Sequence, residues 1–257
     1  MTETAPVIEI RDLHKAYGAL EVLKGVSMTA PRGHVISLIG SSGSGKSTLL
    51  RCANLLEDSQ QGDIVFEGEP VKWKGSGLNR HPSDRAQITR IRTNLSMVFQ
   101  QFNLWSHMTI LQNVMEAPVT VMKRDPAEVE KKARDYLDKV GIGDKCVVWP
   151  AQRSGGQQQR AAIARALCME PRALLFEVPA CALDPELEQE VIRVIKALAN
   201  EGRTMLIVTH DMSLACDVSD HVVFLHQGKI EEEGAPDALF GSPKSTRLQQ
   251  FLSAVSA

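Results

Sequence analysis

Short runs of consecutive apolar residues recur along the chain, separated by longer segments with helical periodicity. Such runs are typical of strands that are buried on both faces of a parallel sheet. Nearer the N-terminus, residues 7–11 alternate between apolar and polar positions, and residues 22–28 follow a turn at Gly18. This alternation predicts an antiparallel sheet ahead of the first buried run. The predicted buried strands lie at residues 35–39, 173–176, 204–208 and 222–225, with a further short strand at 63–68.

Helical periodicity follows several of these strands. Residues 49–56 and 185–200 carry apolar side chains on one face, and Gly202 ends the second helix. A pattern that is helical from 107 to 150 includes a helix at 126–140 that begins at Pro126, and a polar surface excursion at 72–90 leads into a helix near 84–92. Strands that alternate with helices predict an α/β fold with a mostly parallel sheet. The stripe of the 185–200 helix consists of Leu187, Val191, Val194, Ile195 and Leu198.

Composition narrows the class of protein. With 257 residues and 43% hydrophobic residues, the chain can form one large α/β domain with a smaller subdomain. A net charge of −2 without a basic block gives little support for a nucleic-acid partner. No apolar run approaches the ~20 residues of a membrane helix, and residues 1–6 do not resemble a signal peptide, so we expect a cytoplasmic protein. The cysteines lack CxxC spacing and are expected to be free thiols.

A complete phosphate-binding loop lies between the strand at 35–39 and the helix from residue 49. Its glycines allow backbone angles that let successive N–H groups wrap a polyphosphate, and the helix adds its positive end. Lys46 supplies charge to the outer phosphates, and Ser47 offers a hydroxyl to Mg²⁺. A flexible Gly/Ser linker is the alternative, but a linker would not continue into an apolar helix. The loop consists of Gly40, Ser41, Ser42, Gly43, Ser44, Gly45, Lys46, Ser47 and Thr48.

A second motif, Ser154-Gly155-Gly156-Gln157, precedes the helical run 161–167. Ser154 with Gln157 fits a capping box, and the two glycines leave the helix start bare, as an anion site requires. An ordinary capped helix remains the alternative, which the nearby phosphate loop disfavours.

With both motifs in place, the chain resembles the ATP-binding subunits of ABC transporters nearly end to end. The family's phosphate loop matches residues 40–48 and its signature matches 154–158. The resemblance implies one nucleotide-binding domain over residues 1–257: a P-loop NTPase (RecA-like) core with a mostly parallel sheet, an N-terminal antiparallel β subdomain and an inserted α-helical subdomain. The core would comprise 1–100 and 155–240, the helical signature subdomain 101–154, and the C-terminal tail 241–257.

The resemblance also carries individual site residues. Tyr17 matches the aromatic that stacks on adenine, Gln100 the glutamine of the glutamine loop, and His210 the switch histidine. Catalytic roles are implied for His210, Gln100 and Glu177, a nucleotide contact for Asp184, and Mg²⁺ ligation for Ser47, Gln100 and Glu177. A surface aromatic at Tyr17 and a satisfied strand-end histidine at His210 remain the alternatives.

Finer features resemble the polar-amino-acid uptake branch, and within it the histidine, lysine/arginine/ornithine and opine (octopine and nopaline) permeases. These features lie at 102–109, 224–234 and 247–252. The resemblance implies a homodimer that sandwiches ATP between the phosphate loop of one copy and Ser154 to Gln157 of the other. It implies two integral membrane permease subunits and, indirectly, a periplasmic solute-binding protein, with the chain peripheral on the cytoplasmic face of the bacterial inner membrane. Phe102 and Trp105 either contact the membrane partner or pack in the core.

One segment departs from the family. The family ordinarily reads Asp-Glu-Pro-Thr-Ser-Ala-Leu-Asp where this chain has residues 177–184, Glu-Val-Pro-Ala-Cys-Ala-Leu-Asp. Glu177 is still an oxygen donor but one methylene longer than aspartate, and Mg²⁺ tolerates poor geometry badly. Val178 stands at the general-base position, and loss of a positioned base costs roughly 10²- to 10⁴-fold in rate. Arg153 replaces the leucine that the family prefers before the signature serine.

Two hypotheses therefore compete. The chain is either an ordinary uptake ATPase or an ATP-binding gating subunit with impaired hydrolysis. A soluble ABC ATPase of DNA repair or chromosome packaging is a third class, which the lack of coiled-coil inserts and basic surfaces disfavours.

Overall fold

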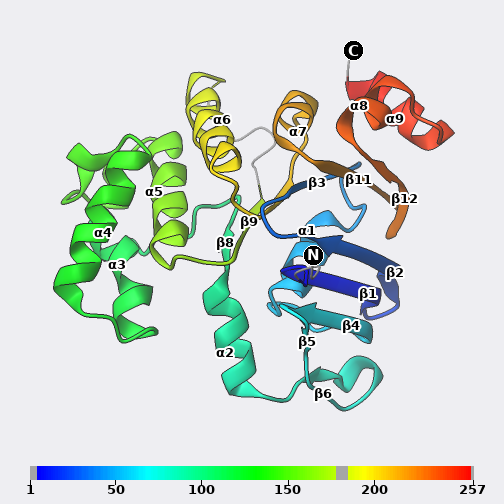
Figure 1. The fold of residues 1–257 in the computed structure, drawn as a ribbon, viewed down its shortest axis with the longest axis horizontal. Helices are drawn as coiled ribbons and strands as arrows, with labels where there is room; N and C mark the ends of the chain where they lie inside the picture. The colour runs from blue at the N-terminus through cyan, green and yellow to red at the C-terminus, as the bar shows by residue number, and fades with distance from the viewer. Residues whose placement is uncertain (1–4, 178–184, 256–257) are drawn as a thin grey trace.

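The computed structural model describes residues 5–177 and 185–255, and its centre is a mostly parallel sheet (Figure 1). The strand order is β12-β11-β3-β10-β9-β8, and every neighbouring pair is parallel except β11 with β12. The predicted α/β fold is confirmed. The strands are β3 (Val35–Ile39), β8 (Leu95–Val98), β9 (Ala173–Glu177), β10 (Met205–Val208), β11 (His221–His226) and β12 (Lys229–Gly234).

Both faces of this sheet are covered, which explains the continuous apolar runs. In β9, Leu174 and Phe176 enter one hydrophobic cluster, whereas Ala173 and Leu175 enter another. The first cluster is shared with helices α3 (Ile110–Thr120), α4 (Pro126–Lys139), α5 (Gly155–Cys168) and α6 (Pro185–Asn200), and the second with α1 (Lys46–Ala53). A strand that is buried on both sides has no polar face, so the pattern does not alternate.

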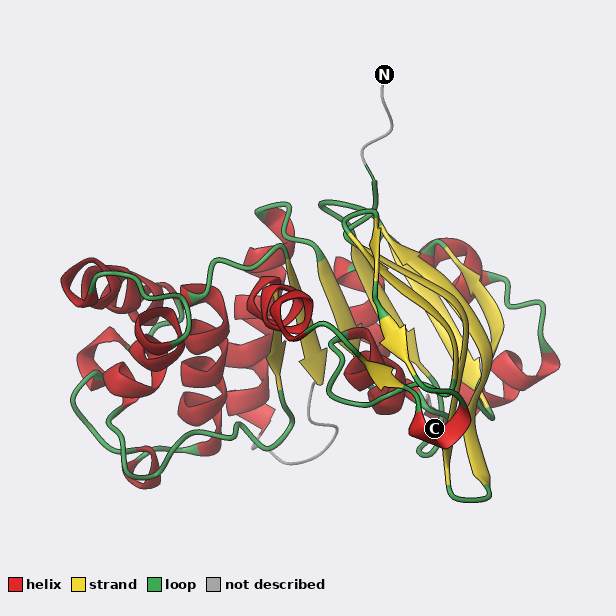
Figure 2. Cartoon of the chain, turned by 90° about the horizontal axis from the view of Figure 1, so that it is seen from below, coloured by secondary structure: helices red, strands yellow, loops and turns green. Residues whose placement is uncertain are grey.

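The predicted N-terminal antiparallel sheet is present and covers the second cluster. Its order is β2-β1-β4-β5, with Ile8 opposite Ala30 on one side and Phe66 on the other. Figure 2 shows the strands gathered toward one end of the molecule and a group of helices at the other. The strands are β1 (Ile8–Tyr17), β2 (Leu20–Ala30), β4 (Gln61–Phe66) and β5 (Glu69–Pro70).

The segment with helical pattern from 107 to 150 is shorter in helix than predicted. It contains α3 and α4, and the bounds of α4 agree within one residue with the helix predicted at 126–140; Gly141, with φ 73°, lies just after the end of α4. A glycine in this left-handed conformation is a common helix terminus. Beyond it lie only 3₁₀ turns at Gly143–Lys145 and Pro150–Gln152. The helix predicted at 185–200 is confirmed as α6.

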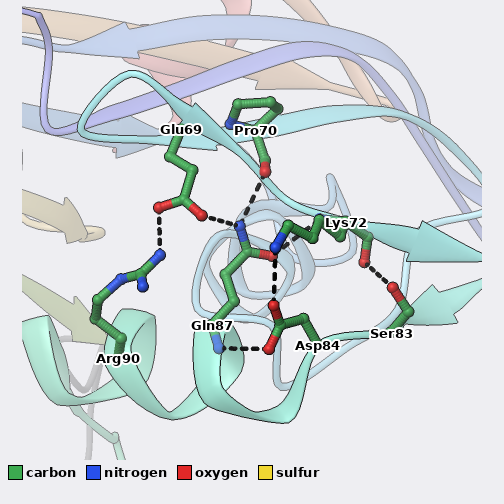
Figure 3. Close-up of polar contacts among 7 residues, drawn as sticks. All are labelled: Glu69, Pro70, Lys72, Ser83, Asp84, Gln87 and Arg90. Atoms are coloured by element: carbon green, nitrogen blue, oxygen red, sulfur yellow. Dashed lines mark hydrogen bonds and ion pairs between the residues drawn. The ribbon is translucent and has the colours of Figure 1, made fainter.

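The buried side-chain amide of Gln87 connects the surface excursion at 72–90 to the neighbouring strand β5 (Figure 3). The excursion carries a small hairpin of β6 (Trp73–Lys74) and β7 (His81–Pro82) and enters α2 (Arg85–Asn94). Gln87 is 2% exposed, and its Nε2 donates to Glu69 Oε1 at 2.8 Å and to Pro70 O at 2.9 Å. Its Oε1 accepts from the backbone N–H of Lys72 at 2.9 Å. Asp84 caps the helix, and its carboxylate lies 2.9 Å from Lys72 Nζ.

The C-terminal elements form a third hydrophobic cluster against β11. They are α7 (Met212–Val218), α8 (Pro236–Gly241) and α9 (Thr246–Val255), and the rings of Phe224 and Phe251 lie 5.2 Å apart between centroids. Within the described ranges, no helix has the length and apolar character needed to cross a membrane.

Candidate functional site

A cleft of about 440 Å³ lies where β3, β9 and β10 end. Ligands in open α/β sheets bind at the carboxyl ends of the strands. The cleft brings together most of the phosphate loop with Gln100, Glu177 and His210, which are far apart in the sequence. Its lining residues are Leu20, Val22, Ser42, Gly43, Gly45, Lys46, Ser47, Thr48, Gln100, Glu177, Val208 and His210.

The phosphate loop has a backbone that its glycines make possible. Gly40 has φ 143°, and a Cβ there would lie 2.2 Å from the carbonyl oxygen of Leu225. Gly45 has φ 106°, and a Cβ there would lie 2.9 Å from Leu23 Cδ2. The helix α1 begins at Lys46 without a side-chain cap, so its first N–H groups are left for a ligand.

Lys46 is held by the loop itself. Its side chain is buried, and Nζ donates to Gly40 O at 2.8 Å, to Ser41 O at 2.9 Å and to Ser44 Oγ at 3.4 Å. Burial lowers the pKa of Lys46 to about 8, because these partners are neutral oxygens and the ammonium has lost water. An anionic ligand would supply the charge that the neutral oxygens do not.

His210 follows β10 and is placed by the residues on either side of it. The backbone N–H of Asp211 donates to Thr209 Oγ1 at 3.0 Å, and the Asp211 carboxylate caps α7 at Ser213 and Leu214. Burial, and then the nearby charge of Lys46, lower the pKa of His210. The imidazole is therefore neutral at pH 7 and can either donate or accept a hydrogen bond.

Glu177 ends β9 as a buried carboxylate, one oxygen of which makes an ion pair but no hydrogen bond within the part of the chain that the structure describes. Arg51 lies 3.4 Å from each oxygen, but Oε1 has no hydrogen-bond partner among the described residues. Together with the Ser47 hydroxyl and the Gln100 amide in the same cleft, this oxygen fits the hard ligands that Mg²⁺ needs. The described residues hold no group of three His, Cys, Asp or Glu side chains suited to a metal. A cation here would thus depend on these oxygens and on phosphate.

Tyr17 lies at the mouth of the cleft rather than in its lining. It ends β1 opposite Leu20, which does line the cleft, and its side chain is 46% exposed. Burial, and then the carboxylate of Glu57, raise the pKa of Tyr17. The side chain of Thr48 in the phosphate loop acts in the opposite direction and lowers this pKa. Tyr17 is thus positioned beside the end of the loop with ring surface still accessible.

The signature motif does not reach this cleft within one chain. Ser154 caps α5 through its Oγ, which accepts from the N–H of Gln157 at 3.4 Å, so the serine half of the predicted capping box is present. None of the residues from Ser154 to Gln157, Gly155 and Gly156 included, lines the cleft. The Nε of Arg153 is buried and lacks a partner among the described residues. Val178 and Asp184 lie outside the described residues.

Arg165 belongs to the site's surroundings, although no sequence motif points to it. Its guanidinium donates to the carbonyls of Asn103 at 2.6 Å and Phe102 at 2.9 Å, both of which have positive φ. It also lies 5.6 Å from the ring centroid of Trp105. Arg165 therefore ties the loop after Gln100 to helix α5. A charged residue within the alanine-rich run 161–167 was the available signal.

Beside this loop lies a second, mostly apolar groove of about 430 Å³, to which Asn103, Trp105 and Arg165 contribute. Phe102 packs partly against the first hydrophobic cluster, whereas Trp105 is 40% exposed. Of the two aromatic residues, Trp105 is the one left available to another molecule.

Comparisons with known proteins place these features in a family. The model of the ABC transporter family matches residues 23–180. Nopaline permease ATP-binding protein P of Agrobacterium fabrum is 55% identical over 256 residues, which is 99% of this chain and 100% of that protein. The histidine/lysine/arginine/ornithine transport ATP-binding protein HisP of Escherichia coli is 56% identical over 247 residues, 95% of this chain and 96% of that protein.

Two solved structures of ABC transporter proteins are similar to this chain as well. The dimeric structure of MJ0796, a bacterial ABC transporter cassette, has a TM-score of 0.77 at 32% identity and covers 89% of this chain and 98% of that one. The structure of cbiO1 from Clostridium perfringens, part of the ABC transporter complex cbiONQ, has a TM-score of 0.80 at 27% identity and covers 98% and 100%.

Proposed function

The chain belongs to the ABC transporter family, and we propose that it is the ATP-binding, energy-coupling subunit of an importer for polar or basic amino acids or opines. The observation that carries the proposal is the cleft, which gathers the phosphate loop, Gln100, Glu177 and His210 in one chain. Subunits named for nopaline and for histidine, lysine, arginine and ornithine transport match that chain almost end to end.

In this proposal, the loop amides, Lys46 and the start of α1 bind the outer phosphates of ATP, while Tyr17 stacks on adenine. Ser47, Gln100 and Glu177 would hold Mg²⁺, which when bound neutralises phosphate charge. The neutral imidazole of His210 would hydrogen-bond the γ-phosphate. Asp184 would add a nucleotide contact from the segment that follows Glu177.

A second copy would complete the site. Ser154, Gly155, Gly156 and Gln157 do not line the cleft of their own chain, which is consistent with their serving the cleft of a partner. The dimeric structure of MJ0796 supports a homodimer. Residues 1–100 and 155–240 would act as the ATP-binding core, 101–154 as the helical signature subdomain, and 241–257 as the tail.

Two integral membrane permease subunits are the proposed partners, with the chain peripheral on the cytoplasmic face of the bacterial inner membrane. The groove beside Trp105 supports a docking site for them, because it joins an exposed aromatic ring to the loop that carries Gln100. A periplasmic solute-binding protein would act through these subunits, without contact to this chain.

The comparisons give no support to a subunit with impaired hydrolysis, the alternative that rests on Val178. An ATPase assay on the purified chain and on Val178→Glu measures directly what the missing carboxylate costs. A positioned base contributes about 10²- to 10⁴-fold, so turnover of the unaltered chain within about tenfold of the variant eliminates the alternative.

Solute class is tested by uptake. In cells that carry the membrane subunits, at least one of labelled arginine, histidine, octopine and nopaline should enter, and only when this chain is present. Lys46→Ala, which removes the phosphate contact, is the matched inactive control. Uptake of none of these solutes, with the complex assembled, contradicts the proposed substrate class.

A further inference from the structure

Lys15 lies against the face of Tyr17, and we propose that it is a positioning residue for the adenine base. Its Nζ is 4.7 Å from the centroid of the Tyr17 ring, and both residues belong to β1. The inference rests on the proposed function, because it takes Tyr17 as the base-stacking residue. It adds a residue whose effect is exerted through that ring.

The ammonium of Lys15 is fixed in place by the segment that follows the phosphate-loop helix. Lys15 is 6% exposed, and its Nζ lies 2.9 Å from Glu57 Oε2 and donates to the carbonyl of Asp58 at 2.7 Å. Glu57 and Asp58 follow shortly after α1. A buried lysine with two anchored partners cannot swing freely, so its position beside the ring is set before any ligand arrives.

Lys15 leaves part of the Tyr17 ring open. Tyr17 remains 46% exposed although the cation occupies one side of the ring. A cation over an aromatic face is attracted by the quadrupole of the ring, and the attraction is stronger when water is excluded. The ring is therefore held in one orientation, and a base that stacks on the open side does not have to order it. Ordering that is done in advance raises affinity.

Charge neutralisation of Glu57 is the competing explanation for Lys15. That explanation predicts a loss of stability on mutation, without a preference between ligands that do and do not contain a base. The two explanations separate when ATP is compared with tripolyphosphate, which offers the same phosphate chain without adenine.

The experiment measures dissociation constants for ATP and tripolyphosphate by calorimetry on the full chain. The variants are Lys15→Met, Lys15→Gln, Tyr17→Ala and the double variant Lys15→Met/Tyr17→Ala, with Lys131→Met, an exposed lysine of α4, as the control. We expect Lys15→Met and Lys15→Gln to weaken ATP binding about three- to tenfold, as loss of a largely desolvated cation–π contact implies. Tripolyphosphate binding should stay unchanged. The double variant should bind ATP no more weakly than Tyr17→Ala, because Lys15 acts through the ring.

Three results overturn the inference. Equal weakening of both ligands shows that Lys15 supports the phosphate loop generally. Unchanged ATP binding in both Lys15 variants, with weaker binding in Tyr17→Ala, leaves the base role of Tyr17 intact and removes Lys15 from it. Unchanged ATP binding in Tyr17→Ala removes the base role itself. Lys15→Gln retains a donor for the Asp58 carbonyl and serves where the methionine variant does not fold.

Discussion

Raising the pH above about 8 should weaken nucleotide binding through one buried lysine. The pKa of Lys46 in the free site is lowered from 10.5 to about 8 by burial among neutral oxygens. Phosphates bound beside it favour the charged ammonium and raise its pKa again. The free protein therefore loses this proton as the pH passes 8, whereas the complex keeps it, so binding must take up a proton and the dissociation constant rises.

The magnitude follows from linkage. Each pH unit above the free-state pKa costs about tenfold in affinity until the pKa of the complex is reached. Between pH 7 and pH 9 the loss should thus be about tenfold, given a free-state pKa of about 8. The same shift destabilises the free fold by about 3 kcal/mol at neutral pH, since one pKa unit corresponds to about 1.36 kcal/mol. Because the unfolded chain holds the proton up to about pH 10.5, stability should rise with pH from about 8 to 10.5.

The assay is a titration of ATP into the Mg²⁺-free protein from pH 7 to 9 at constant ionic strength. His210 does not titrate here, because its pKa lies below its ordinary 6.5. The remaining ionisation of the terminal phosphate of ATP near pH 7 strengthens binding as the pH rises, and it acts equally on any variant. Lys46→Arg is the matched control, since a guanidinium stays charged throughout this range. A flat affinity in the unaltered protein, or an equal slope in Lys46→Arg, would refute the reasoning.

Other predictions concern a buried hydrogen bond, a core side chain and the contacts of Arg165 with the loop after Gln100. Gln87→Leu leaves the backbone N–H of Lys72 without its acceptor. It should lower the free energy of unfolding, measured in urea, by about 2–3 kcal/mol and leave ATP affinity unchanged, and a loss under about 0.5 kcal/mol contradicts this prediction. Phe176→Ala, at a fully buried position, should lower the free energy of unfolding by about 3–5 kcal/mol in the same assay, and Phe176→Leu should lower it much less. Equal losses in the two variants would show that a cavity is not the cause. Arg165→Met should speed amide hydrogen exchange at residues 100–105 but not in α4, and unchanged exchange there would show that its carbonyl contacts do not hold the loop.

Local pattern was enough wherever an unbroken apolar run or a long apolar stripe marks a whole element. The bounds of β3 and α6 coincide with the prediction because an unbroken apolar run and a long helical stripe are set by their own residues. The pattern does not predict β8, because Ser96 interrupts its short apolar run. It does not predict β12 either, because this edge strand alternates in exposure and carries three glutamates. The helical pattern predicted from 107 to 150 is not one continuous helix, because Gly141 follows the end of α4 and only 3₁₀ turns lie between it and α5.

The residues of the candidate site also fall into those that a local motif predicts and those that only the tertiary structure brings together. The phosphate loop is a local motif, and physical chemistry gave its geometry directly. Gln100 and Glu177 share a cleft only because β8 and β9 are neighbours in the sheet, which no spacing reveals, and the family resemblance supplied them. The contacts of Lys15 and Arg165 are tertiary, so their place beside the site had to be seen in three dimensions.

Helix α5, which Ser154 caps, is held closely to the elements that line the cleft. The buried side of α5 packs in the same cluster as Phe176, one residue before Glu177, and Arg165 of that helix grips the loop after Gln100. We therefore expect a displacement of α5 to reach the cleft by two routes, one through the sheet and one through the loop. Both routes end in the cleft, so we expect a displacement of the loop at the groove beside Trp105 to move residues that line the cleft.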